Sequence, residues 1–280
     1  MDAVPISFEQ ELNVWEEQVR AAQSQIDLSC EEISYLPIGG TAIGTGINAP
    51  KQFSKNVCSE LNKIYNEMKL KFKPLHIKGE MMSSQNHIFT LSSAITRYAS
   101  TLSKIANDIR WMNSGPISGL SEITLKALQP GSSIMPGKVN PVIEESVAMV
   151  CAQVMGNDLT VSVAGQSGNF ELNVMLPVVA HNLLESIELL ANAANNLADR
   201  SVSRLTIRED VITDKVGKNP ILVTALNPII GYDLAAKIAK KAYAEGRALK
   251  EVAKEMTDLT DQDLDTALDP MKMTQGGFTE

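Results

Sequence analysis

The sequence predicts an all-α protein built around a bundle of long helices. Apolar residues recur at alternating spacings of three and four over long stretches, which is the pattern of a helix with one buried stripe. No stretch shows the convincing polar–apolar alternation of a half-buried strand. Helices of about 22 to 30 residues measure roughly 33 to 45 Å, so they need lateral neighbours and are expected to pack side by side.

The first helix is expected from Ile6 to about Leu36. Its apolar residues fall on one stripe, namely Phe8, Leu12, Trp15, Val19, Ala22 and Ile26. A glycine-rich connector over residues 38–50 interrupts this pattern. Proline suits the first turn of a helix, so Pro50 is expected to open a second helix that ends near Leu70. Residues 71–82 are expected to form an irregular crossing.

The clearest helix runs from Ile88 to Met112, where the three–four alternation continues for more than three heptads. Its apolar positions are Ile88, Leu91, Ile95, Tyr98, Leu102, Ile105, Ile109 and Met112. Such a seam is typical of helical bundles. A loop-rich segment over residues 117–130 follows. A fourth helix is then expected from just after Pro141 to about Val163, and a fifth from Leu172 to Ala198.

Shorter helical patterns follow Arg200. They cover about residues 208–216, 232–245, 249–255 and 260–267. This change in element length predicts two domains, a central helical bundle over residues 1–203 and a small helical domain over residues 204–280.

Composition narrows the class of protein. With 280 residues, of which 44% are hydrophobic, the chain can bury a sizeable core. Its formal net charge of −8 argues against nucleic acid or an anionic membrane as a partner. No apolar run approaches the length needed to span a bilayer, and no signal peptide is recognisable, so a cytoplasmic location is expected.

Neither a metal site nor a cofactor site is expected. The three cysteines, Cys30, Cys58 and Cys151, are widely spaced and each lies on a predicted helix. This spacing suggests neither a disulfide framework nor a zinc site.

A polar loop between two predicted helices is the candidate functional site. Residues 131–141 read Gly-Ser-Ser-Ile-Met-Pro-Gly-Lys-Val-Asn-Pro, and Glu144 and Glu145 follow. The prolines and glycines interrupt helical structure, so the hydroxyls, the cation and the amide are presented on a loop. Loops on rigid scaffolds often carry functional groups, and glycines let a loop act as a lid. The alternative reading is a surface turn with solvated side chains.

The Gly131–Pro141 loop resembles the signature of the fumarase/aspartase superfamily, whose members add or remove water, ammonia or an amine across a fumarate carbon–carbon bond. Class II fumarase is the most similar group. Further runs that resemble it are residues 39–50, 105–111, 155–158, 167–174, 222–227, 230–233 and 268–273. Gly137 stands where aspartases typically have alanine. Val142-Ile143-Glu144 replaces the usual fumarase Thr-Gln-Cys, which keeps an aspartase reading open.

The resemblance implies a role for each polar residue. Removing a proton beside a carboxylate creates a carbanion whose charge spreads onto that carboxylate, and fixed donors stabilise it. Ser132 is implied to transfer the proton at carbon, after activation by nearby positive charge. The residues implied to bind the substrate are Ser133, Lys138, Val139 and Asn140. Glu145 is implied to orient a catalytic histidine.

Two neighbouring residues have less specific readings. Glu144 is expected to be solvated or to act as a first-turn charge near a helix N-terminus. For Asn140, a simple helix cap is the alternative to substrate binding.

The catalytic histidine of the family has no counterpart here. It sits in a Gly-Arg-Thr-His-Leu motif immediately before a segment that resembles Asp2-Ala3-Val4-Pro5. His76, His87 and His181 are expected to be structural or solvated. The resemblance therefore implies a carboxy-terminal portion of a fumarase, without the first bundle helix and inactive by itself.

The leading hypothesis is thus part of a fumarate hydratase, which reversibly hydrates fumarate to L-malate. The alternatives are an aspartate ammonia-lyase and a non-catalytic helical assembly module. The expected partners are a small dicarboxylate, further copies in a homotetramer as in the family, and a separate N-terminal chain. The location would be mitochondrial if a transit peptide lay upstream.

Overall fold

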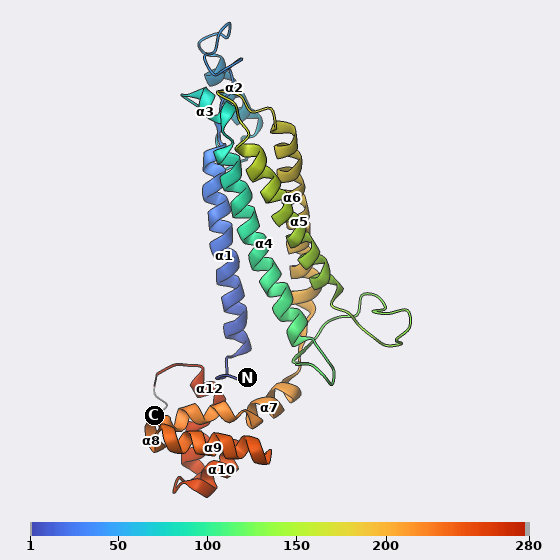
Figure 1. Ribbon diagram of the computed structural model, residues 1–280, viewed down its shortest axis with the longest axis vertical. Helices are drawn as coiled ribbons and strands as arrows, with labels where there is room; N and C mark the ends of the chain where they lie inside the picture. The colour runs from blue at the N-terminus through green and yellow to red at the C-terminus, as the bar shows by residue number, and fades with distance from the viewer. Residues whose placement is uncertain (1, 278–280) are drawn as a thin grey trace. The chain divides into compact units, whose positions relative to one another are not determined.

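The computed structural model describes residues 2–277 and confirms the all-α prediction (Figure 1). The chain forms two compact units. The bundle unit comprises Glu17–Trp111 and Leu125–Leu205, and the carboxy-terminal unit comprises Met1–Glu16, Met112–Thr124 and Thr206–Glu280. The boundary between domains expected after residue 203 stays a prediction.

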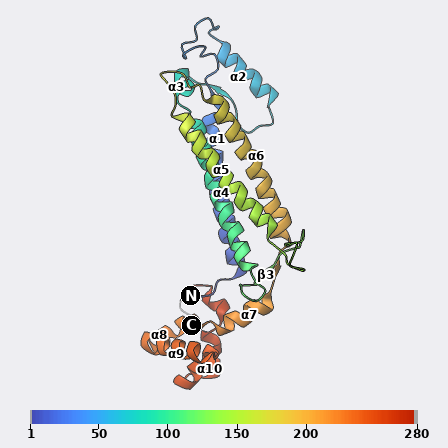
Figure 2. The ribbon, with the colours of Figure 1, turned by 45° about the vertical axis from the view of Figure 1, so that its right-hand side comes forward.

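Four long helices run side by side in the bundle unit (Figures 1 and 2). They are α1 (Phe8–Ile33, which begins in the other unit), α4 (Asn86–Met112), α5 (Val142–Gly165) and α6 (Leu176–Asn196). A π-helical segment, Leu197–Ser201, and a 3-10 turn, Val202–Arg204, continue the chain directly beyond α6. The π-helix is a rare element that is often found near functional sites.

The apolar seam of α4 is buried as its spacing predicted. The buried members on this helix are Leu91, Ile95, Leu102, Ile105 and Ile109, and on α5 and α6 they are Val147, Val154, Val161, Val179, Leu183 and Leu190. Removing such side chains from water is the main stabilising term of a helical bundle. The apolar residues of α6 are only partly buried, because Leu176 and Ile187 are exposed.

Helix α5 is more apolar than expected, and polar contacts tie it to its neighbours. Among residues 2–277 it is the one helix whose length and composition would suffice to cross a membrane, a property that core helices of bundles share. The Oγ of Ser92 donates a hydrogen bond of 2.5 Å to Asp158 Oδ1. The Nδ2 of Asn157 donates one of 2.9 Å to Glu185 Oε2. These bonds join α5 to α4 and to α6, as in a packed bundle.

The predicted second helix, Pro50 to about Leu70, is shorter in the structure, and the predicted irregular crossing contains regular elements. Helix α2 (Phe53–Ile64) begins after Pro50, because the N–H of Phe53 bonds to the carbonyl of Pro50 in a turn. The crossing contains a short helix, α3 (Lys78–Ser83), and β2 (Lys73–Pro74), which pairs in parallel with β1 (Tyr35–Leu36).

The fifth helix starts at Leu176 instead of Leu172, and the Asn173 side chain explains the delay. Its Nδ2 donates to the carbonyl of Ala164 (2.9 Å), and its Oδ1 accepts from the N–H of Met175 (2.8 Å). Asn173 is thereby held in a turn that precedes the helix.

The carboxy-terminal unit consists of short helices. They are α7 (Glu209–Lys218), a 3-10 helix (Pro220–Leu226), α8 (Asn227–Ile230), α9 (Tyr232–Glu245), α10 (Leu249–Met256), α11 (Asp261–Ala267) and α12 (Pro270–Met273). In addition, β3 (Ile123–Thr124) pairs antiparallel with β4 (Thr206–Ile207). Leu226, Ile238, Val252 and Leu264 form the centre of its core.

We predict that Ile238→Ala destabilises the chain far more than Tyr243→Ala on the same helix. Ile238 is fully buried, whereas Tyr243 is 80% exposed. The first change should lower the free energy of unfolding by about 2–5 kcal/mol and the second by less than about 0.5 kcal/mol. Urea unfolding followed by circular dichroism measures both, and equal effects would contradict this core assignment.

Candidate functional site

The Gly131–Pro141 loop belongs to the bundle unit and leads directly into α5. Figure 1 shows the segment before α5 as an open loop that projects away from the helices. The N–H of Gly131 donates a hydrogen bond of 2.9 Å to the carbonyl of Lys138, which closes the base of the loop. A Cβ on Gly131 would lie 2.7 Å from that carbonyl oxygen and 2.8 Å from Asn140 Oδ1. The closure therefore requires glycine at this position.

The tip of the loop is a tight turn. The N–H of Lys138 donates to the carbonyl of Met135 (3.2 Å), and Gly137 has a φ of +79°. Residues other than glycine rarely adopt this left-handed conformation. On the incoming side, Ser132 Oγ accepts a hydrogen bond of 3.2 Å from the N–H of Ile134. These local bonds give the loop a defined shape without a covering element.

The residues predicted to bind substrate lie on the open side of this loop. Ser133, Lys138 and Val139 are exposed, whereas Ser132 and Asn140 are half-buried. Within residues 2–277 no hydrogen bond joins Ser132 to Lys138, so this structure does not show the activating contact expected for the serine. The loop presents a hydroxyl, an ammonium and an amide to solvent.

The helix that follows begins without an asparagine cap. Helix α5 starts at Val142 and its N-cap residue is Pro141, so the capping role considered for Asn140 does not apply. Glu145 lies in the first turn and is half-buried, and its N–H donates to the carbonyl of Pro141 (3.0 Å).

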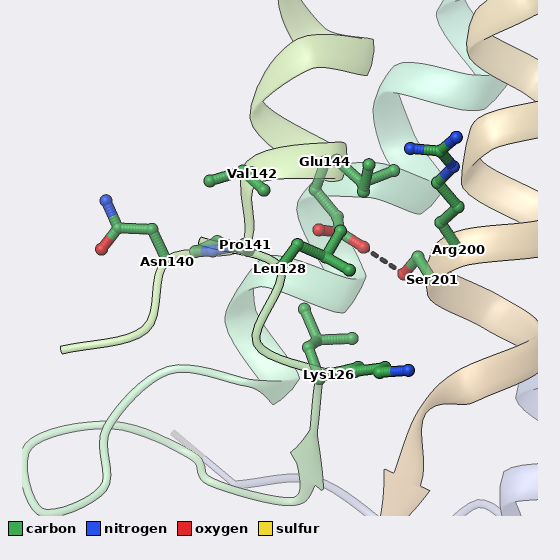
Figure 3. A pocket seen from close by; sticks show the side chains of 10 residues that line it. Lys126, Leu128, Asn140, Pro141, Val142, Glu144, Arg200 and Ser201 are labelled. Carbon is green, nitrogen blue, oxygen red and sulfur yellow. Dashed lines mark hydrogen bonds between the residues drawn. The ribbon is translucent and has the colours of Figure 1, made fainter. Parts of the chain in front are cut away.

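Glu144 was expected either to be solvated or to act as a first-turn charge near a helix N-terminus, and the first of these readings is wrong. It is only 1% exposed and its Oε1 accepts a hydrogen bond from Ser201 Oγ (Figure 3). The reason is its direction: the side chain points toward the π-helical segment after α6 and away from the loop. The expected place in the first turn of α5 is confirmed.

A small cavity lies beside this pair of residues. Its volume is about 10 Å³, and its lining includes Lys126, Asn140, Glu144, Arg200 and Ser201. A space of this size holds about one water molecule. It is therefore too small for a four-carbon diacid, although Asn140 of the loop contributes to its lining.

The three histidines lie away from the loop. Helix α5 begins at the end of the bundle where α4 ends (Figures 1 and 2), whereas His87 lies at the start of α4. The 27 residues of α4 span about 40 Å. His76 lies between β2 and α3, just before α4, and His181 lies in the second turn of α6, which follows the end of α5. All three histidines therefore belong to the end of the bundle opposite the start of α5 (Figures 1 and 2).

His87 instead lines a cavity of about 320 Å³ together with Glu32 and Glu80. Burial lowers the pKa of His87, and the nearby carboxylates of Glu80 and Glu32 partly oppose this shift. Its Nδ1 is buried without a hydrogen-bond partner in the described structure. The expectation that His87 is structural or solvated stays a prediction.

The described residues contain no group of three His, Cys, Asp or Glu side chains arranged to hold a metal ion. Cys30, Cys58 and Cys151 are free thiols. Burial raises the pKa of Cys151 to about 11, which makes its reactive thiolate scarce.

Comparisons with known proteins agree with this architecture. The sequence model of a lyase family matches residues 1–156, and that of the fumarase C C-terminus matches residues 222–275. The chain is 53% identical over 278 residues to fumarate hydratase class II 2 of Pseudomonas aeruginosa, covering 99% of the chain and 60% of the relative. It is 50% identical to fumarate hydratase class II of Xylella fastidiosa, covering 99% and 58%.

Solved structures show the same likeness. The class II fumarase from Schistosoma mansoni superposes with a TM-score of 0.92 and 40% identity, over 98% of this chain and 60% of that one. A fumarate lyase:delta crystallin from Brucella melitensis, bound to cobalt, gives 0.91 and 42%, over 98% and 59%.

The chain thus spans about three-fifths of the length of the relatives it matches. The lyase family model alone covers more than half of the chain, and the fumarase C-terminal model lies near its end. The chain belongs to the lyase family that includes the class II fumarate hydratases, and it corresponds to a carboxy-terminal portion of them.

Proposed function

We propose that this chain is the carboxy-terminal part of a class II fumarate hydratase, which interconverts fumarate and L-malate. The observation that carries the proposal is the Gly131–Pro141 loop, which is intact in sequence and is held at the start of α5. The named relatives support it, because they are fumarate hydratases that match the chain along nearly its whole length.

The proposed chemistry divides among the residues of the loop. Lys138 supplies an ammonium and Asn140 an amide donor to a substrate carboxylate, where charge accumulates when the neighbouring carbon loses its proton. Ser133 and Val139 contact the same substrate. Ser132 is the proposed base at carbon, and its hydroxyl becomes competent when positive charge approaches it.

The proposed site is completed by polypeptide outside this chain. The loop is exposed, and the histidines lie away from it. We therefore assign the water-activating histidine, which Glu145 would polarise, to a separate N-terminal chain. Exposed apolar residues on the bundle helices, such as Met149 (68%) and Leu159 (66%) on α5, support an assembly. We propose a homotetramer in the cytoplasm.

The conformation of Gly137 favours the fumarase over the aspartase alternative. Its φ of +79° disfavours the alanine that aspartases typically carry at this position. The other departure, Glu144, points away from the loop and leaves its polar groups unchanged.

We predict that the purified chain alone shows no turnover of malate, because it lacks a histidine beside the loop and a wall that excludes water. Ultraviolet absorbance of the fumarate formed measures this. Measurable turnover would show that the described residues suffice for catalysis.

We further predict that Lys138→Ala lowers kcat/KM for malate by about 100-fold or more once an N-terminal polypeptide restores activity, because a donor to the developing charge is lost. The matched control is Lys55→Ala, which removes an exposed lysine on α2. Equal activity of both variants would favour the assembly-module alternative. Ammonia release from aspartate that exceeds malate turnover would favour the aspartase alternative.

A further inference from the structure

A buried carboxylate joins the end of the Gly131–Pro141 loop to the bundle. Glu144 is 1% exposed, although an isolated carboxylate is costly to remove from water. Its hydrogen-bond donor is Ser201, which is itself only 2% exposed. The two residues are 57 positions apart in the sequence, so this bond is a tertiary contact.

The contact joins the end of the π-helical segment to the start of α5. Ser201 is the last residue of the π-helical segment Leu197–Ser201, where the helix type changes to a 3-10 turn. Glu144 lies in the first turn of α5, directly after the loop. The bond therefore fixes the beginning of one helix against the end of another, at the position where the loop leaves the bundle.

The side chains of Glu144 and Asn140 point in different directions, toward the bundle and away from it. Figure 3 shows Glu144 and Ser201 pointing toward each other, while Asn140 lies on the other side of Pro141 and points away. Arg200 is exposed, and no ion pair between it and Glu144 is found within residues 2–277. Glu144 is thus directed toward the bundle, whereas the polar groups of the loop face outward.

We propose that Glu144 is a positioning residue whose hydrogen bond with Ser201 sets the place of the loop. The Gly131–Lys138 bond closes the loop on itself but does not attach it to the helices. On the incoming side the chain is attached through the buried Leu125. On the outgoing side, attachment runs through Asn140, Pro141 and the first turn of α5, which the Glu144–Ser201 bond holds. The consequence for catalysis rests on the proposed function, but the anchoring can be tested without substrate.

Two measurements on the whole chain test the anchor. The first is the rate of trypsin cleavage after Lys138 under native conditions, and the second is hydrogen exchange of residues 131–145. Ser201→Ala and Glu144→Ala should each accelerate both by about tenfold, because the first turn of α5 opens more often when a buried hydrogen bond is lost. Glu144→Gln keeps an oxygen acceptor for Ser201 and should stay within about twofold of the parent.

The matched control is Glu188→Ala, which removes an exposed carboxylate from α6 and should leave both rates unchanged. Parent-like rates in folded Ser201→Ala would overturn the proposal. So would an equal loss of exchange protection in the middle of α5 and α6, because the pair would then be a general core contact. Ser201→Ala decides the question if Glu144→Ala does not fold. Accelerated loop rates in Ser201→Ala with unchanged activity of the reconstituted enzyme would support the anchor and count against the proposed function alone.

Discussion

The hydrogen bond between Glu144 and Ser201 holds the first turn of α5, where the packed bundle and the polar loop meet. After this turn, Val147 and Val154 of α5 are buried in the bundle, which fixes the helix axis. Before it, Gly131 and Lys138 close the loop through one backbone hydrogen bond. A short polar segment can therefore be presented to solvent at a defined place without a covering element.

This arrangement agrees with the proposal that one chain forms only part of a site. A loop at one end of the bundle can contact other polypeptide from several sides. Residues at the other end of the bundle, such as His87, cannot reach it. The proposed division of labour follows: this chain supplies the ammonium and the hydroxyl, and neighbouring polypeptide supplies the histidine and the enclosure.

The sequence predicted features that depend on local spacing and missed those that depend on distant partners. The seam of α4 was predictable because three–four spacing directly reflects a helix with one buried face. The loop was found because its residues are contiguous. The burial of Glu144 was missed because Ser201 lies 57 positions away. The start of α6 was displaced by the buried side chain of Asn173, which a periodicity argument does not register. The roles of Ser132, Ser133, Lys138, Val139, Asn140 and Glu145 stay predictions.

The most direct test of the central claim is a crystal structure of this chain assembled with an N-terminal fumarase polypeptide and malate. We expect Lys138 Nζ and Asn140 Nδ2 to lie within hydrogen-bond distance, about 3 Å, of one malate carboxylate, with Ser132 Oγ facing the carbon that loses its proton. A complex in which malate is bound while Lys138 and Ser132 point away from it would contradict the proposed roles of these residues.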